Sequence, residues 1–244
     1  ALATLKQALE VAQKIEHAYR KASTLRGIAS ALAKAGDGKQ ALEVAQKIED
    51  VYFKATALRE IASALVEAGD KEQALATLKQ AVEAVQKIES ARSKAPALAD
   101  IASALAKAGD KGQALATLKQ ALEVAQQIES ADGTLRNIAS ALAEAGETTQ
   151  AFEVAQQIES ADGTLRNIAL DLAEAGEIKQ ALEVAQKIEG AKEKAFALSS
   201  IAVSLAEAGD REQALATLKQ ALEVAQKIGA AGYKDYARRD IASA

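Results

Sequence analysis

The chain has 244 residues, 49% of them hydrophobic and 26% charged, with a formal net charge of −4 at pH 7. It has no cysteine and a single histidine, His17, which excludes disulfides, thiolate chemistry and zinc sites built on Cys or His. The negative charge disfavours a polyanionic partner. No signal-peptide pattern and no apolar run of about eighteen residues occurs. We therefore expect a soluble protein, cytoplasmic by default, with no cofactor, no metal and no membrane partner.

One pattern recurs from end to end. Residues 1–15 match residues 214–228, so the chain opens inside a partial repeat, 1–21. Complete repeats are predicted at 22–54, 55–94, 95–131, 132–161, 162–194 and 195–234, followed by a partial repeat at 235–244. Because repeats share cores only with their neighbours, residues 1–244 are predicted to be a single continuous array.

The sequence of each repeat predicts two amphipathic helices, which we call helix A and helix B. In the second complete repeat, Leu58, Ile61 and Leu65 recur at the three-and-four spacing of helix A. Gly69 then ends the helix, since glycine tolerates positive φ. Asp70 and Gln73 predict a capping box that starts helix B, with the Gln73 side chain reaching back to the cap. Neither helix can bury its apolar stripe alone, so the pairs should stack.

Repeat length varies in steps of seven and three residues. Seven extra residues after Gly69, Gly109 and Gly209 should lengthen helix B without turning its buried face. Three extra residues before some A helices should add a turn to their start. Pro96 is expected in such a first turn, because proline is tolerated there.

Acidic residues mark the predicted helix starts. Glu147 and Glu177 replace the capping aspartate and should be poorer caps. Asp132 and Asp162, in the two compact connections, are predicted to be the N-caps of the helices that follow.

The third complete repeat resembles the tetratricopeptide repeat at Leu98, Ile101, Ala102, Leu105, Gly109, Ala114, Leu118 and Ala121. The resemblance covers essentially the whole chain, although the family's aromatic signature residues are Leu or Ala here and its closing proline is absent. It implies an all-α, right-handed superhelical solenoid of antiparallel helix pairs. It also implies a non-enzymatic protein or peptide-binding scaffold whose concave groove is lined by the A helices.

By the same resemblance, exposed positions beside the buried isoleucine of helix A should contact the ligand. They hold a row of arginines, followed in two repeats by Asn, with serines one turn on. Forked guanidinium donors suit carboxylates, so the groove is predicted to favour acidic or C-terminal carboxylate segments. The predicted peptide-binding residues are Arg26, Arg59, Arg136, Asn137, Ser140, Arg166 and Asn167, with Arg239 in the partial copy. Alternatively, these arginines pair with nearby Glu and Asp on a solvated surface.

Two other functions remain open. The uncapped ends could pack head to tail, which would make the chain a self-associating homo-oligomer without a groove ligand. RNA binding, by analogy with pentatricopeptide repeats, is disfavoured by the acidic balance and few aromatics. We expect no catalysis, because no Ser-His-Asp set and no phosphate loop occurs. His17 is expected at the surface, and Tyr19, Tyr52, Phe53, Phe196, Tyr233 and Tyr236 near the connections, mainly for packing.

Overall fold

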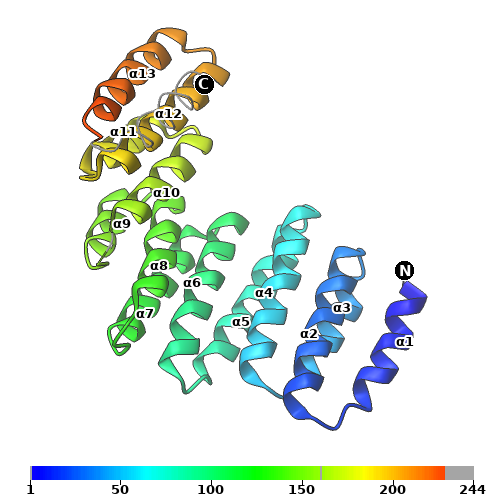
Figure 1. Ribbon diagram of the computed structural model, residues 1–244. Coiled ribbons are helices and arrows are strands. Elements are labelled where there is room, and N and C mark those ends of the chain that lie inside the picture. The colour runs from blue at the N-terminus through cyan, green and yellow to red at the C-terminus, as the bar shows by residue number, and fades with distance from the viewer. Residues whose placement is uncertain (1, 160, 229–244) are drawn as a thin grey trace. The chain divides into compact units, whose positions relative to one another are not determined.

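The structure, a computed structural model, describes residues 2–159 and 161–228, and within these ranges every regular element is an α-helix (Figure 1). This confirms the predicted all-α repeat solenoid. The helices are α1 (Leu2–Gln13), α2 (Ala18–Lys34), α3 (Gly38–Gln46), α4 (Val51–Glu67), α5 (Lys71–Gln86), α6 (Ala91–Ala108), α7 (Lys111–Ala125), α8 (Asp132–Glu144), α9 (Thr148–Ala155), α10 (Ala161–Glu174), α11 (Ile178–Lys187), α12 (Ala191–Glu207) and α13 (Arg211–Gln226).

The helices form two compact units, Ala1–Thr134 and Leu135–Ala244, which we call unit 1 and unit 2 and describe separately. In unit 1 the antiparallel pairs are α2–α3, α4–α5 and α6–α7, and in unit 2 they include α10–α11 and α12–α13. The even-numbered helices are therefore the A helices and the odd-numbered ones the B helices. The partial repeat 235–244, with Arg239, and the tyrosines Tyr233 and Tyr236 lie outside the described residues.

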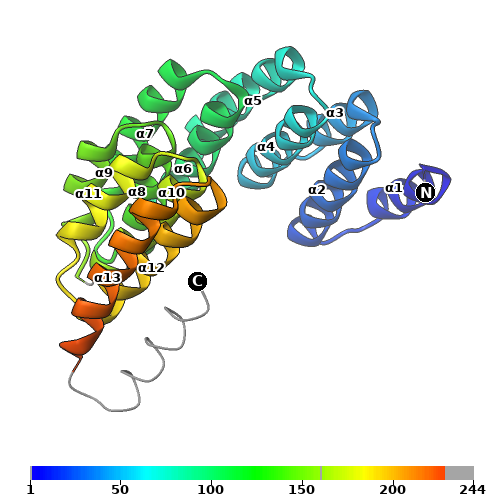
Figure 2. The ribbon, with the colours of Figure 1, turned by 90° about the horizontal axis from the view of Figure 1, so that it is seen from above.

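Successive A helices pack directly on one another, as α2 on α4, α4 on α6 and α10 on α12. Figures 1 and 2 show α2 and α4 side by side in unit 1. The B helices α3, α5 and α11 each pack on their own A helix and on the next one. Three pairs of glutamines also bridge successive B helices, with Nε2 to Oε1 distances of 2.8 to 3.3 Å: Gln46–Gln80, Gln86–Gln120 and Gln186–Gln220.

The glycine turns take the geometry that the sequence predicts. Gly36, Gly69, Gly109, Gly146, Gly176 and Gly209 all have φ between +79° and +100°. After Gly69, the Asp70 N–H donates to the Leu65 carbonyl at 2.9 Å, which ends helix A with a Schellman motif. The Asp70 carboxylate then accepts the Gln73 N–H at 3.1 Å and starts helix B.

One detail of this turn was predicted wrongly. In a capping box the Gln73 side chain would accept from the Asp70 N–H, but that N–H already donates to Leu65. The glycine turn and the Gln73 side chain would both use the Asp70 N–H as donor. In the structure this N–H bonds to the Leu65 carbonyl of the turn.

The two glutamate caps differ from the aspartate caps as expected. Asp37, Asp70, Asp110 and Asp210 each accept a backbone N–H three residues on, whereas Glu147 and Glu177 make no side-chain cap bond. We predict that Glu147→Asp, or Glu177→Asp, raises the free energy of unfolding by about 0.5 to 1 kcal/mol, because the shorter side chain reaches the N–H. Urea denaturation checks this. The reverse change, Asp70→Glu, is the control and should destabilise.

The length steps also appear where they were predicted. The extended B helices α5, α7 and α13 have 15 or 16 residues, against 8 to 10 for α3, α9 and α11. The extended A helices have 17 or 18 residues, against 13 and 14 for α8 and α10. The extra turn brings Lys94 and Lys194 to the Gln86 and Gln186 carbonyls, at 2.8 and 2.7 Å. Each lysine thus caps the end of the preceding B helix.

Pro96 lies deeper than predicted. It is the sixth residue of α6, in the second turn rather than the first. Because proline has no N–H, the Arg92 carbonyl loses its usual helical partner. The first turn of α6, before the proline, is closed by the Lys94 N–H, which donates to the Ser90 carbonyl at 2.8 Å.

The prediction that Asp162 caps α10 is also wrong. An N-cap at Asp162 would place the helix start at Gly163, but α10 begins two residues earlier, at Ala161. The Asp162 carboxylate instead binds the next repeat. Its Oδ1 accepts the Glu189 N–H at 3.0 Å, and its Oδ2 accepts the Gly190 N–H at 2.9 Å. Asp132 is likewise the first residue of α8 rather than the residue before it. Asp162 therefore fixes the connection between α11 and α12.

Candidate functional site

The predicted arginines occupy one position on the A helices, two residues before an isoleucine of the core. Ile28, Ile61, Ile138 and Ile168 are buried, which fixes the direction of the neighbouring side chains. Arg26 and Arg59 lie in unit 1, and Arg136 and Arg166 in unit 2. The structure thus arranges the described arginines as two pairs, each with its own surroundings.

In unit 1 the two arginines share one carboxylate. Glu60 Oε1 lies 3.8 Å from Arg26 Nη1 and 3.6 Å from Arg59 Nη2. A second acid, Asp100 of α6, faces Arg59. Burial raises the pKa of the Asp100 carboxyl above its usual value, and the positive charge of Arg59 opposes this rise. In this unit the surface pairing considered as the alternative is present.

Aromatic side chains adjoin these charges. The Phe53 ring is buried and contacts the edges of Tyr19, at 5.0 Å, and Tyr52, at 5.7 Å between centroids. The Arg26 guanidinium lies 5.9 Å from the centre of the Phe53 ring. Tyr19 and Tyr52 belong to the first turns of α2 and α4, and both rings remain exposed. Only Phe53 of the three is a packing residue.

In unit 2 the arginines contact neutral groups. Arg136 Nε donates to Thr164 Oγ1 at 3.2 Å, from α8 to α10. Arg166 donates through Nε and Nη2 to Asn167 Oδ1, at 3.3 and 3.0 Å, and lies 5.4 Å from the centre of the Phe196 ring. Within residues 2–159 and 161–228, neither guanidinium has a carboxylate within 4 Å.

The other predicted contact residues of unit 2 are accessible. Asn137 is exposed beside Arg136, and Ser140 is half-buried one turn further along α8. Asn167 is half-buried and accepts the Arg166 hydrogen bonds with its carbonyl oxygen, which leaves its amide NH₂ group as a hydrogen-bond donor. Arg136, Asn137, Ser140, Arg166 and Asn167 thus offer hydrogen-bond donors along the A helices α8 and α10.

The partners of these arginines were missed in the sequence. Glu60 directly follows Arg59 and lies 34 positions after Arg26, which is about one repeat. That spacing is the signal that could have found the shared carboxylate. Thr164 is fully buried, and no sequence pattern marks it as the acceptor for Arg136.

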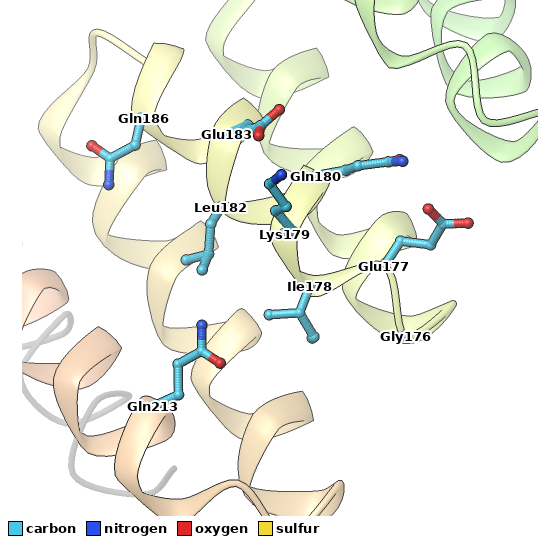
Figure 3. Close-up of a pocket in the computed structure, with 9 residues that line it drawn as sticks. All are labelled: Gly176, Glu177, Ile178, Lys179, Gln180, Leu182, Glu183, Gln186 and Gln213. Atoms are coloured by element: carbon cyan, nitrogen blue, oxygen red, sulfur yellow. The ribbon is translucent and has the colours of Figure 1, made fainter.

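A hollow of about 630 Å³ lies elsewhere, on the B helices of unit 2. Figure 3 shows Ile178 and Leu182 of α11 and Gln213 of α13 beside it. None of the predicted contact residues lines this hollow. A smaller one, of about 50 Å³, lies between α4 and α6 in unit 1 and includes Tyr52, Arg59, Pro96 and Asp100.

The described residues contain no group of three or more His, Cys, Asp or Glu placed to hold a metal ion. Over the same ranges, no helix combines the length and the apolar character that crossing a membrane requires. His17 is exposed at the start of α2, as predicted.

Comparison with known proteins agrees with this architecture. The tetratricopeptide repeat family model matches residues 53–127, which cover two helix pairs from α4 to α7. Since the same helix pairs continue through the described chain, the protein is a tetratricopeptide-like helical repeat protein. Repeats of this family are scaffolds rather than enzymes. No curated protein matches the sequence.

Several solved structures have a similar general architecture. Ton1535 from Thermococcus onnurineus NA1 is 17% identical, with a TM-score of 0.45 over 97% of this chain and 94% of that one. A Rap protein in complex with competence and sporulation factor is 18% identical, with a TM-score of 0.48 over 91% and 69%. YrrB, described as a tetratricopeptide repeat protein with an unusual peptide-binding site, is 20% identical, with a TM-score of 0.37 over 83% and 97%.

Proposed function

We propose that the protein is a non-enzymatic scaffold that binds an extended acidic peptide segment on the A helices of unit 2. The observation that carries this proposal is the contrast between the two arginine pairs. Arg26 and Arg59 are already paired with Glu60, whereas Arg136 and Arg166 contact only neutral partners among the described residues.

The contacts of Arg136 and Arg166 orient these side chains without neutralising them. Thr164 holds Arg136 through Nε, which leaves both Nη groups as donors. Asn167 and the Phe196 ring hold Arg166, which leaves Nη1. A held guanidinium loses less side-chain entropy when it binds a carboxylate, and a charged hydrogen bond contributes about 1.5 to 3 kcal/mol. Asn137, Asn167 and Ser140 would bind the peptide backbone beside the carboxylates.

Arg26 and Arg59 belong to the same proposal with a smaller role. A ligand carboxylate would have to compete with Glu60 for both of them. We therefore expect them to strengthen acidic peptide binding less than the unit 2 pair does.

The test is a titration of acidic peptides against the wild type and the Arg136→Ala, Arg166→Ala double variant. We expect the double variant to bind at least about tenfold more weakly, because two charged contacts are lost. The matched control is Arg26→Ala, Arg59→Ala, which removes the same number of charges and should have a smaller effect. Binding should also weaken as salt rises.

Equal affinity of the wild type and the unit 2 variant would reject the proposal. Amidating the C-terminus of the peptide separates recognition of the terminal carboxylate from that of side chains.

Light scattering on the same samples examines the competing function, self-association without a ligand. The apolar side chains exposed on α1 and α13, Val11, Leu215 and Leu222, favour that alternative. A mass that rises with concentration and no peptide binding would support it.

A further inference from the structure

Two exposed tyrosines form a repeated feature on the A helices of unit 1. Tyr19 is 64% exposed and Tyr52 is 41% exposed. Each stands nine residues before the buried isoleucine of its helix, Ile28 or Ile61, so the rings occupy equivalent positions on neighbouring helices. The buried Phe53 contacts both rings, at 5.0 and 5.7 Å. Each tyrosine ring therefore packs against Phe53 on one side and remains exposed to solvent elsewhere.

The groove beside Tyr52 continues this surface. Tyr52, Thr56 and Arg59 of α4 face Pro96 and Asp100 of α6 around the hollow of about 50 Å³. A hollow of this size suits a small compact side chain such as the proline ring. One wall is an aromatic ring and another is a proline, so the hollow offers apolar contact to a pyrrolidine ring.

The four charged groups that pair with one another beside Phe53 and the hollow are balanced in sign. Arg26 and Arg59 carry two positive charges, and Glu60 and Asp100 oppose them with two negative ones. A strongly charged ligand gains little from such a set. The two tyrosine hydroxyls, in contrast, can donate hydrogen bonds to carbonyls of an extended backbone. The surface thus favours an uncharged ligand that presents apolar rings and free carbonyls.

The distance between neighbouring A helices indicates which class of peptide fits this surface. Packed helices lie about 8 to 10 Å apart. A polyproline II segment rises about 3.1 Å per residue, so three residues span about 9 Å, and every third side chain meets the next helix in the same orientation. Its backbone carbonyls are unpaired, and aromatic grooves bind such segments with little loss of entropy. We propose that the surface formed by Tyr19, Tyr52 and the hollow beside Pro96 binds a polyproline II peptide with prolines three residues apart.

This surface lies in unit 1 and includes Arg59, which has a minor role in the proposed acidic-peptide binding, whereas the main acidic-peptide residues Arg136 and Arg166 lie in unit 2. The test therefore uses uncharged peptides and substitutes the tyrosines alone. The probe is a dye-labelled peptide with proline at every third position and alanine between. A second peptide has the same composition with its prolines clustered. Fluorescence anisotropy measures the affinity of each for the wild type, for Tyr19→Ala, Tyr52→Ala, and for the conservative double variant Tyr19→Phe, Tyr52→Phe.

We expect the spaced peptide to bind the wild type at least about tenfold more tightly than the clustered one, and the alanine variant to lose this preference. The phenylalanine variant should keep most of it, because the rings remain. Phe152→Ala, which removes a half-buried ring from unit 2, is the control and should bind the spaced peptide as the wild type does. Helical circular dichroism verifies the fold of each variant.

Three results would overturn the inference. They are equal affinity for the spaced and clustered peptides, unchanged affinity of the alanine variant, and no binding of the spaced peptide at millimolar concentration. Acidic peptides report on the other site, so loss of their binding in the Arg136→Ala, Arg166→Ala variant alone leaves this inference unaffected.

Discussion

Replacing Ile61 with alanine should lower the free energy of unfolding by about 2 to 5 kcal/mol. Ile61 is fully buried in α4, which packs on α2, α5 and α6. The substitution removes apolar contact and leaves a cavity that neighbouring alanines are too short to fill. Because each repeat is stabilised mainly by its neighbours, the loss weakens the packing of unit 1 from its middle pair.

Chemical denaturation followed by circular dichroism measures the effect. The matched control is Val66→Ala in the same helix, where the side chain is only half-buried and the cost should stay below about 1 kcal/mol. If the two variants were equally stable, the face of α4 that carries Ile61 would not be the core face. The direction assigned to Arg59 and Glu60 would then be wrong as well.

The helix pairs could be predicted because their causes are local. Apolar spacing identifies the buried faces, and a glycine with positive φ ends each A helix. The seven-residue steps were also predictable, because seven residues nearly complete two helical turns. Val85 near the end of the longer helix α5 is therefore buried, as Val44 is in the shorter helix α3. These features depend on residues that lie close together in the chain.

The wrong predictions concern hydrogen-bonding groups that have one possible partner nearby in the sequence and another in a different helix or repeat. The Asp70 N–H was assigned to Gln73, yet the preceding helix supplies a better placed acceptor in Leu65. Asp162 was assigned to its own helix, yet it binds two N–H groups 27 and 28 residues later. A sequence pattern shows that a carboxylate can cap a helix, but it does not show which helix end lies nearest in the stack.

The candidate site shows the same division. The row of arginines could be predicted, since each stands two residues before a buried isoleucine. Their different surroundings could not, because these depend on one substitution in each neighbouring repeat. Glu60 neutralises the unit 1 pair, and Asn167 replaces it at the same position in α10. That replacement of a charged acceptor by a neutral one is the basis for placing the acidic ligand on unit 2.

The connection between α11 and α12 provides the second large effect. Asp162 accepts the Glu189 and Gly190 N–H groups, and a Cβ on Gly190 would lie 2.7 Å from Asp162 Oδ2. Asp162→Ala should therefore destabilise unit 2 by about 2 kcal/mol, because two charged hydrogen bonds are lost at a partly exposed site. Gly190→Ala should have a cost of similar size, since the carboxylate must move away.

The two substitutions should not be additive. Once Asp162 is alanine, the added methyl group no longer meets the Asp162 carboxylate, and the Glu193 Oε2 at 3.3 Å is the oxygen that stays near it. Gly190→Ala should then cost about 1 kcal/mol less than it does in the wild type. A double-mutant cycle from urea denaturation measures this coupling. The control is Gly27→Ala in α2, where a Cβ meets no atom within 4 Å, and which should stabilise by about 0.5 to 1 kcal/mol. Additive costs at Asp162 and Gly190 would show that the carboxylate does not hold this connection, and that the glycine is there for some other reason.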